Sequence, residues 1–309
     1  MTRSSKFRAC PLCEAICGLE LQFEAEKLVA IRGDDADPFS RGHICPKGNA
    51  ILDLEADPDR LRRPMRRIGD QWQEIGWDEA FTLAGNELAN IQKEYGANSI
   101  GSYLGNPNVH HFGHIAYLPF LLKIIRSQNV FSASSVDQWP HQLVNAQMYG
   151  HQFLLPIPDI DHTDYFLMLG ANPIASNGSL MTVPDVKERI KALTARGKLI
   201  VIDPRKTETA AIASEHHFIK PAGDVYFLIA FLQQLFKTGP ARLQAYDEKI
   251  IGWSEAISAI ENFQIENIFE LTGIGAESIQ TMANDFYRAD KAVAYGRMGC
   301  STQIHGTIC

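Results

Sequence analysis

The stretch Cys10-Pro11-Leu12-Cys13-Glu14-Ala15-Ile16-Cys17 places three cysteines close together near the start of the chain, and a fourth follows at Cys45. Four of the six cysteines therefore lie within the first 45 residues. Thiolates are soft ligands, so such a group, with one member returning after a loop, can enclose one soft metal centre. The candidate metal ligands are Cys10, Cys13, Cys17 and Cys45.

The spacing of these cysteines favours a 4Fe-4S cluster. They follow the pattern C-x2-C-x3-C-x27-C, and Pro46 comes directly after the last one. Structural zinc is the alternative, but zinc modules usually supply their ligands as two pairs. Here the second half of the motif contributes a single cysteine, which suits a cluster better than a zinc ion.

The bulk composition is that of a globular protein. With 309 residues, 45% of them hydrophobic and 21% charged, the chain is long enough for about two domains. A net charge of -7 argues against a nucleic-acid surface, which needs clustered basic residues. One basic run, residues 60–67, is short and is split by Pro64. We expect it to be a solvated linker with isolated salt bridges rather than a polyanion patch.

The sequence also bears on location. No apolar run approaches the roughly 20 residues of a membrane span, and the N-terminal residues lack the apolar core of a secretory signal. We therefore expect a cytoplasmic protein without a membrane span. In a reducing compartment, clustered cysteines are more often metal ligands than disulfides.

The first of three expected domains, residues 1–60, carries the cysteines. Apolar and polar residues alternate at 19–23, and a second apolar run at 28–31 precedes a Gly-Asp-Asp turn. This pattern predicts a β-hairpin. The loop that follows is expected to return Cys45 to the first three cysteines.

The second expected domain, residues 61–145, reads as an incomplete α/β domain. An amphipathic helix is predicted over residues 77–95 and ends at Gly96. A buried strand over 99–105 and a second helix over 116–126 are expected to follow.

The third expected domain, residues 146–309, is a dinucleotide-binding α/β domain. The expected strands are 165–170, 199–203, 212–219 and 292–296, and the expected helices are 186–196, 225–236 and 276–289. Such alternation is typical of a parallel sheet with helices on both faces, which binds nucleotides at the carboxyl ends of its strands. The predicted fold class is thus α/β, with a small iron-sulfur domain followed by α/β domains that include a Rossmann-like doubly wound sheet.

Two loops at strand ends carry the candidate nucleotide contacts. Gly170 directly after a strand lets the backbone approach a diphosphate, and Asn172 and Ser176 offer small polar groups at the next helix start. Asp203 ends the following strand, where it can accept hydrogen bonds from a ribose or a guanine edge. An ordinary NAD-binding Rossmann domain is one alternative, but its G-x-G-x-x-G fingerprint is missing after Leu169. The other alternative is that Asn172-Pro173 is merely a turn.

Several ordered motifs resemble one known family. They are the cysteine motif, Cys45-Pro46-Lys47-Gly48, Trp77-Asp78-Glu79-Ala80, Gly170-Ala171-Asn172-Pro173-Ile174-Ala175-Ser176, Asp203-Pro204-Arg205-Lys206-Thr207-Glu208-Thr209-Ala210, Pro221-Ala222-Gly223-Asp224 and Gly296-Arg297-Met298-Gly299. Together they resemble the N-terminal portion of the molybdenum or tungsten bis-molybdopterin guanine dinucleotide oxidoreductases, the group of formate dehydrogenase, periplasmic nitrate reductase and dimethyl sulfoxide reductase. The resemblance spans essentially the whole chain.

The resemblance implies two cofactors, a 4Fe-4S cluster and a molybdopterin guanine dinucleotide with Mo or W. It implies that Lys47 lies between cluster and pterin on the electron route, although a solvated surface lysine is an equal alternative. The residues it implies for dinucleotide binding are Gly170, Asn172, Ser176, Asp203, Arg205, Thr207, Gly223, Asp224 and Met298. The expected partners are a small-molecule substrate and an electron-transfer protein, with no nucleic acid.

The sequence departs from the family at the metal ligand. Formate dehydrogenases place Cys or selenocysteine directly before a histidine, whereas Pro140 precedes His141 here. Proline cannot bind a metal. Either Asp137 or a serine in the preceding stretch (Ser132, Ser134 or Ser135) reaches the metal, or no protein atom does. His141 is a candidate catalytic proton acceptor, with a structural role as the alternative.

Two further groups are assigned plain structural roles. His110, His111 and His114 have helical spacing, but without an evident carboxylate partner we expect capping and packing rather than metal binding. Cys300 and Cys309 are expected to be ordinary buried thiols.

These motifs predict part of a molybdopterin-dependent oxidoreductase whose cluster exchanges electrons with the Mo or W centre, with formate as the leading substrate. The family needs a further large region beyond Cys309, so the chain is expected to be a fragment with exposed apolar surface. A catalytically silent cofactor-binding or electron-relay module and a zinc-stapled α/β protein are the alternatives.

Overall fold

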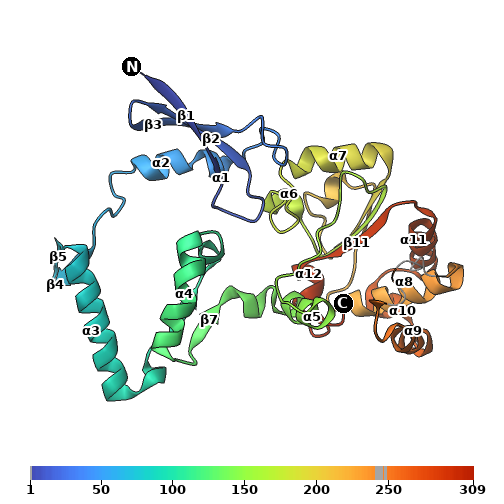
Figure 1. Cartoon of the computed structure of the whole chain (residues 1–309). Helices are drawn as coiled ribbons and strands as arrows, with labels where there is room; N and C mark the ends of the chain where they lie inside the picture. Colours follow the sequence, from blue (N-terminus) through green and yellow to red (C-terminus); the bar gives the residue numbers. More distant parts are fainter. Residues whose placement is uncertain (1, 241–245, 247–248) are drawn as a thin grey trace. The chain divides into compact units, whose positions relative to one another are not determined.

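The computed structural model describes residues 2–240, 246 and 249–309 (Figure 1). It divides into two compact units, Met1–Ala133 and Ser134–Cys309. Both units mix helices and strands, so the predicted α/β fold class is confirmed. The division into three domains at residues 60 and 145 stays a prediction.

The cysteine-containing part of the first unit is built on a three-stranded antiparallel sheet. Its strands β1 (Arg3–Ala9), β2 (Gly18–Glu24) and β3 (Lys27–Gly33) stand side by side in chain order. The predicted hairpin is therefore confirmed as β2 and β3. The first strand was not predicted, because all seven of its residues are exposed and it carries no buried apolar alternation.

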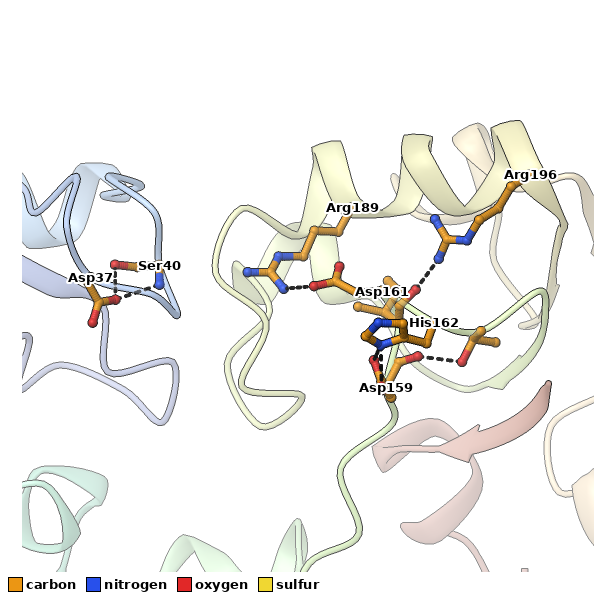
Figure 2. Close-up of polar contacts among 9 residues, drawn as sticks. Asp37, Ser40, Asp159, Asp161, His162, Arg189 and Arg196 are labelled. Atoms are coloured by element: carbon orange, nitrogen blue, oxygen red, sulfur yellow. Dashed lines mark hydrogen bonds and ion pairs between the residues drawn. The ribbon is translucent and has the colours of Figure 1, made fainter.

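A close backbone contact shapes the loop that leads to Cys45. A Cβ atom at Gly33 would lie 1.9 Å from the carbonyl oxygen of Gly42, so only glycine fits at position 33. Farther along the loop, Asp37 Oδ2 accepts hydrogen bonds from the backbone nitrogen and the hydroxyl of Ser40, both at 2.6 Å (Figure 2). Ser40 Oγ accepts in turn from the nitrogen of Gly18 at 3.0 Å. The loop is thereby tied to the residue that follows Cys17.

Replacing Gly33 by alanine is expected to destabilise the first unit by about 1–3 kcal/mol, because the new methyl group overlaps a backbone oxygen that cannot move alone. Thermal unfolding of the variant measures this. Gly85→Ala is the matched control, since no described atom lies within 4 Å of a Cβ at that helical position. Equal stability of the two variants would contradict the contact.

Two short helices follow Cys45, and the basic run comes next. The helices are α1 (Pro46–Asn49) and α2 (Ile51–Ala56). The expectation of a solvated linker was wrong in part, since β4 (Met65–Ile68) pairs with β5 (Gln71–Glu74) within and after the run. Its arginines form exposed ion pairs, as expected: Arg60 and Arg62 with Glu55, Arg66 with Glu79, and Arg67 with Asp70.

The rest of the first unit exposes much apolar surface. Helix α3 (Trp77–Tyr95) ends at Gly96 as predicted, and α4 (Phe112–Ile125) contains the second predicted helix. Strands β6 (Ser102–Leu104) and β7 (Val130–Ser132) form a two-stranded parallel pair. The prediction that β6 is buried was wrong, because Tyr103 at its centre is 75% exposed. Phe112 is 91% exposed, which is unusual for a parallel α/β layer, whose faces are normally covered.

The second unit contains the predicted parallel sheet. Its strand order is β10-β9-β8-β11, with β8 at Tyr165–Leu169, β9 at Lys198–Ile202, β10 at Glu215–His217 and β11 at Ala292–Gly296. Every neighbouring pair is parallel. All five residues of β8 are buried, because helices cover both faces of this central strand.

Alternate residues of the sheet point into two separate cores. On one face Phe166 and Met168 pack with Ile190 and Leu193 of α7 (Val186–Arg196). On the other face Leu167 packs in a cluster with residues of α8 (Asp224–Thr238) and α11 (Ala276–Arg288). Figure 1 shows α7 on one side of the strands and α8 and α11 on the other. This is the doubly wound arrangement that the sequence predicts.

Helix α6 (Pro173–Ser176) lies at the helix start expected after Asn172. Among the described residues of the second unit, the helices that were not predicted are α5 (Trp139–Tyr149), α9 (Trp253–Asn262), α10 (Ile268–Thr272) and α12 (Met298–Ser301). Within the described ranges, no helix is long and apolar enough to cross a membrane.

Side-chain contacts hold the irregular segment before β8 against α7. Arg189 donates to Asp161 Oδ2 at 2.6 Å, and Arg196 donates to the carbonyl oxygen of Ile160 (Figure 2). His162 Nδ1 lies 2.9 Å from Asp159 Oδ2 in the same segment. These contacts fix the approach of the chain to the central strand.

Candidate functional site

The connection between β1 and β2 forms the cysteine loop. The nitrogen of Cys10 donates to the carbonyl oxygen of Cys17 at 2.8 Å, and that of Ile16 donates to Cys13 at 3.2 Å. Ile16 has a φ of +41°, a left-handed conformation that is costly for a β-branched residue. The loop is thus closed tightly on itself, with Cys10 and Cys17 buried and Cys13 partly exposed.

Burial opposes the ionisation of two of the four thiols. Burial raises the pKa of Cys17 to about 11, and the neighbouring thiols of Cys10, Cys13 and Cys45 raise it further. Burial also raises the pKa of Cys10, with smaller contributions from Cys13 and Cys45. A positive centre bound between such thiols would favour their thiolate form.

The donor set of the four cysteines fits an iron-sulfur cluster. Thiolates are the ligands that such clusters take, one to each iron, and Cys10 and Cys17 are buried in an apolar cluster. Within residues 2–240, 246 and 249–309, no three His, Cys, Asp or Glu side chains are gathered as around one metal ion.

Helix α1 brings Lys47 beside the cysteine loop. The ammonium group of Lys47 is close enough to Cys10 to lower the pKa of that thiol, against the larger effect of burial. The next residue, Gly48, is buried, and a Cβ there would lie 3.0 Å from Cγ1 of Ile44 and 3.8 Å from Sγ of Cys10. The absence of a side chain at Gly48 lets the helix pack directly against the ligand loop.

A second site lies at the carboxyl ends of the parallel strands. The chain passes from β8 to β9 on one side and later returns to β11 on the other, so the strand order reverses beside β8. Ligands of doubly wound sheets bind at such a switch point. A pocket of about 150 Å³ opens there, and Gly170, Asn172, Ser176 and Met298 from the predicted set line it. Two further residues line the pocket: Arg297, which belongs to a quoted family motif but was not among the predicted site residues, and Tyr295, which was not predicted.

Gly170 has a backbone geometry that favours glycine. Gly170 has a φ of +55°, and a Cβ there would lie 2.5 Å from Cα of Gly299. The nitrogen of Gly299 donates to the carbonyl oxygen of Gly170 at 3.0 Å. The loops after β8 and β11 therefore contact each other backbone to backbone beside the pocket.

Asn172 has a different role from the free polar contact expected. Its Oδ1 accepts from the nitrogen of Thr209 at 3.2 Å and from the hydroxyl of the same residue at 2.8 Å. Its Nδ2 donates to Glu208 Oε2 at 2.7 Å. The side chain thus joins the loops after β8 and β9, and an exposed ion pair between Arg205 and Glu208 at 3.7 Å continues this network.

The loop after β9 is ordered by its own side chains. Asp203 is nearly buried, and its Oδ1 accepts from the nitrogen of Arg205 at 2.8 Å. Thr207 Oγ1 accepts from the nitrogen of Ala210 at 3.0 Å. In each of these side chains one oxygen accepts a hydrogen bond from a backbone nitrogen of the loop. Asp203 and Thr207 therefore stabilise the conformation of the loop.

Asp224 is an acid held inside the second unit. It follows Gly223 at the start of α8 and accepts a hydrogen bond from Gln303 Nε2 at 2.7 Å. Burial raises the pKa of Asp224, the bond from Gln303 opposes that shift, and the nearby carboxylate of Asp203 adds to it. The structure therefore brings these two predicted acids close to one another.

His141 reaches the same strand end. It lies in the first turn of α5, and its Nε2 donates to the carbonyl oxygen of Gly296 at 3.2 Å. Burial lowers the pKa of His141, the charge of Arg297 lowers it too, and the bond to Gly296 and the charge of Asp137 act in the opposite direction. The lowered pKa favours the neutral imidazole, and the hydrogen bond to the carbonyl oxygen of Gly296 places a proton on Nε2.

The stability of the protein is expected to decrease as the pH is lowered, partly because of His141. Because its folded-state pKa lies below the ordinary value of about 6.5, the folded protein binds fewer protons than the unfolded chain, and stability is lost as the pH drops through that value. Thermal unfolding at about pH 7.5 and 5.5 measures this. His141→Gln should lose less stability over the same range, and an equal loss in both proteins would contradict the burial of a neutral imidazole.

The structural roles expected for His111, Cys300 and Cys309 can be compared with their positions. His111 caps α4, since its Nδ1 accepts from the nitrogen of His114 at 3.4 Å, which confirms the expected capping role. Cys300 is buried as predicted, and burial raises its pKa to about 12. The prediction that Cys309 is buried was wrong, because that residue is exposed.

The first unit thus carries the four candidate cysteines, and the second unit carries a pocket at the switch point of its parallel sheet. Two family models match this chain, the molybdopterin oxidoreductase model over residues 60–270 and the molybdopterin oxidoreductase Fe4S4 domain over residues 8–56. The chain belongs to the molybdopterin oxidoreductase family. The expected cofactor classes, a 4Fe-4S cluster and a molybdopterin with Mo or W, are those of the family and are confirmed at that level.

Individual relatives agree with this assignment. The chain is 24% identical over 298 residues to the F420-dependent formate dehydrogenase 2 subunit alpha of Methanococcus maripaludis, covering 96% of this chain and 43% of the relative. It is 27% identical over 313 residues to formate dehydrogenase H of Escherichia coli, covering 96% and 42%. The chain therefore spans about two fifths of the length of these curated relatives.

One solved structure supports the fold. Acetylene hydratase from Pelobacter acetylenicus superposes with a TM-score of 0.79 at 19% sequence identity, over 98% of this chain and 41% of that protein. At this level of identity the likeness concerns the fold alone.

Proposed function

We propose that the chain is part of a molybdopterin-dependent oxidoreductase in which a 4Fe-4S cluster passes electrons to or from a Mo or W centre. The observation that carries the proposal is the presence, in one chain of this family, of a three-cysteine loop with a fourth cysteine at Cys45 and of a switch-point pocket. The bound metal supplies two-electron chemistry on a small substrate, and the cluster supplies one-electron transfer.

We assign the cluster ligands to Cys10, Cys13, Cys17 and Cys45. Lys47 is proposed to lie on the electron route, because its charge acts on Cys10 and favours the reduced, more negative state of a cluster. This role is supported by the buried Gly48, which lets α1 approach the cysteine loop. A side chain at position 48 would separate them.

The second unit is proposed to hold the pterin dinucleotide. Gly170 admits the diphosphate at the pocket, and Ser176 and Met298 line its walls. Asp203, Arg205, Thr207, Gly223 and Asp224 supply or shape the polar surface beside it. Asn172 acts by holding the loops after β8 and β9 together.

His141 is proposed to accept a proton from the substrate. With Nε2 bound to the carbonyl oxygen of Gly296, the basic atom of the neutral ring is Nδ1. Pro140 stands where related formate dehydrogenases carry a metal ligand, so we infer that the metal takes a non-protein ligand on this side or one from Asp137 or a neighbouring serine.

Formate is the proposed substrate, since formate dehydrogenases are among the relatives that cover almost the whole chain. The test is formate-dependent reduction of a viologen dye by the protein with its full cofactor set. Formate turnover supports the proposal. Absence of turnover in a protein loaded with cluster and pterin would instead favour the catalytically silent electron-relay module. The observation that favours this second candidate is Pro140, which cannot bind the metal as the cysteine or selenocysteine of formate dehydrogenases does.

An electron-transfer partner and a cytoplasmic location complete the proposal. The partner is inferred from the one-electron chemistry of the cluster. The location rests on the use of cysteines as metal ligands. Cell fractionation with an antibody to the chain tests the location.

A further inference from the structure

One buried imidazole in the first unit has no role in the chemistry described so far. His110 follows the short helix η2 (Asn106–Val109), and its side chain is only 10% exposed. Among the residues that the structure describes, its Nε2 has no hydrogen-bond partner. Its backbone is fixed, since the nitrogen of His110 donates to the carbonyl oxygen of Pro107 at 3.3 Å. A buried polar atom of this kind carries a free-energy cost unless it finds a partner.

The nearest acidic group to this atom belongs to the cysteine loop. His110 Nε2 lies 3.7 Å from Oε1 of Glu14, whose side chain is 24% exposed. Glu14 stands directly after Cys13 and before the buried Ala15. A small change of side-chain torsion brings the two atoms to hydrogen-bond distance. This contact connects the segment before α4 to the loop that we assign to the cluster.

The position of Glu14 next to Cys13 means that a hydrogen-bond donor to its carboxylate would affect the cluster. A carboxylate next to a cluster ligand places a negative charge beside a centre that becomes more negative on reduction, which lowers the reduction potential. A donor that binds the carboxylate weakens this effect and also fixes the loop between Cys13 and Cys17. In a partly buried setting the interaction is screened less than at the surface.

We propose that His110 is a positioning residue for the cluster: its Nε2–H group binds the Glu14 carboxylate, holds the cysteine loop in place and offsets the charge of Glu14 on the cluster potential. The inference rests on the proposed cluster. The proposed role is not metal binding by His110, because the contact is between one ring nitrogen and one carboxylate oxygen. It also differs from simple packing, because a packing role needs only the volume of the ring.

The experiment is a double-mutant cycle on the reduction potential of the cluster, measured at one fixed pH by redox titration with electron paramagnetic resonance. His110→Leu keeps most of the volume but removes the donor, whereas His110→Gln keeps a donor at the place of Nε2. Glu14→Gln removes the charge. Each His110 variant is made with and without Glu14→Gln.

His110→Leu is expected to lower the potential, His110→Gln to stay near the original value and Glu14→Gln to raise it. In the presence of Glu14→Gln, His110→Leu should give no further shift. A cluster lost in His110→Leu and regained in His110→Gln also supports the role. Equal effects of the two His110 variants, or a shift that persists with Glu14→Gln, would overturn it.

The same experiment separates the two proposals. An iron-sulfur signal with no coupling between His110 and Glu14 removes this inference and leaves the cluster intact. Purified protein without iron or without the signal removes the proposed cluster, and the role of His110 falls with it. Thermal unfolding of each variant shows whether a shift reflects a general loss of folding.

Discussion

Replacing Cys45 by serine is expected to remove most of the iron from the protein. A 4Fe-4S cluster needs four thiolates, and the other three cysteines lie within one short loop that cannot enclose it. The iron content should fall from about four per chain to a small fraction of that, with loss of the broad visible absorption of the cluster. Colorimetric iron determination on protein purified without oxygen measures the change.

Cys309→Ser is the matched control for this prediction. Cys309 is exposed and lies in the other compact unit, so its thiol is not expected to bind the cluster. The control should keep the iron of the unsubstituted protein. Retention of iron by Cys45→Ser, or equal losses in both variants, would show that Cys45 is not a ligand.

Gly170→Ala is expected to abolish or strongly weaken binding of the pterin dinucleotide. The added methyl group would lie 2.5 Å from Cα of Gly299, and the residue would keep a φ of +55° that alanine disfavours by about 1–2 kcal/mol. The loops after β8 and β11 must then separate, which disturbs the pocket between them. A cost of about 1.4 kcal/mol already reduces affinity tenfold, and the overlap with backbone adds to it. Pterin released from purified protein, quantified by fluorescence after oxidation, measures the loss.

Gly275→Ala provides the control for the pocket. Gly275 lies in the same compact unit before α11, has a φ of -70° and has no described atom within 4 Å of the position of a Cβ. The iron content of both variants should stay unchanged, because the cysteines belong to the other unit. A normal pterin content in Gly170→Ala would contradict the assignment of the switch-point pocket.

The sequence was most informative where a chemical or packing requirement leaves few alternatives. Strands β8, β9 and β11 were predicted to within one residue at each end, because strands such as β8 are buried on both faces and appear as continuous apolar runs. Strand β10 is shorter than the stretch 212–219 predicted for it. The hairpin of β2 and β3 was found from its alternation. The family followed from ordered motifs that need particular ligands and glycines.

Errors arose where tertiary contacts override the local pattern. Strand β1 is polar along its whole length and gains its place by pairing with β2, so its own residues gave no signal. Tyr103 in β6 has the residue type of a buried strand but is exposed. The apolar and small residues near Cys309 likewise suggested that its thiol is buried, but Cys309 is exposed.

The site shows a similar division. Ligand spacing identified the cysteines, but no spacing rule links Asn172 to Thr209 or His141 to Gly296, whose contacts join residues far apart in sequence. Arg297 stands in the quoted motif Gly296-Arg297-Met298-Gly299, but a single basic residue in a motif does not indicate that its side chain lines the pocket. The pair of His110 and Glu14 is also a product of the fold, as 96 positions separate the two residues.

The most direct test of the central claim is metal and pterin analysis of the unsubstituted protein purified without oxygen. The account predicts about four irons per chain together with a pterin nucleotide and Mo or W. Zinc at about one per chain, with neither iron nor pterin, would contradict it.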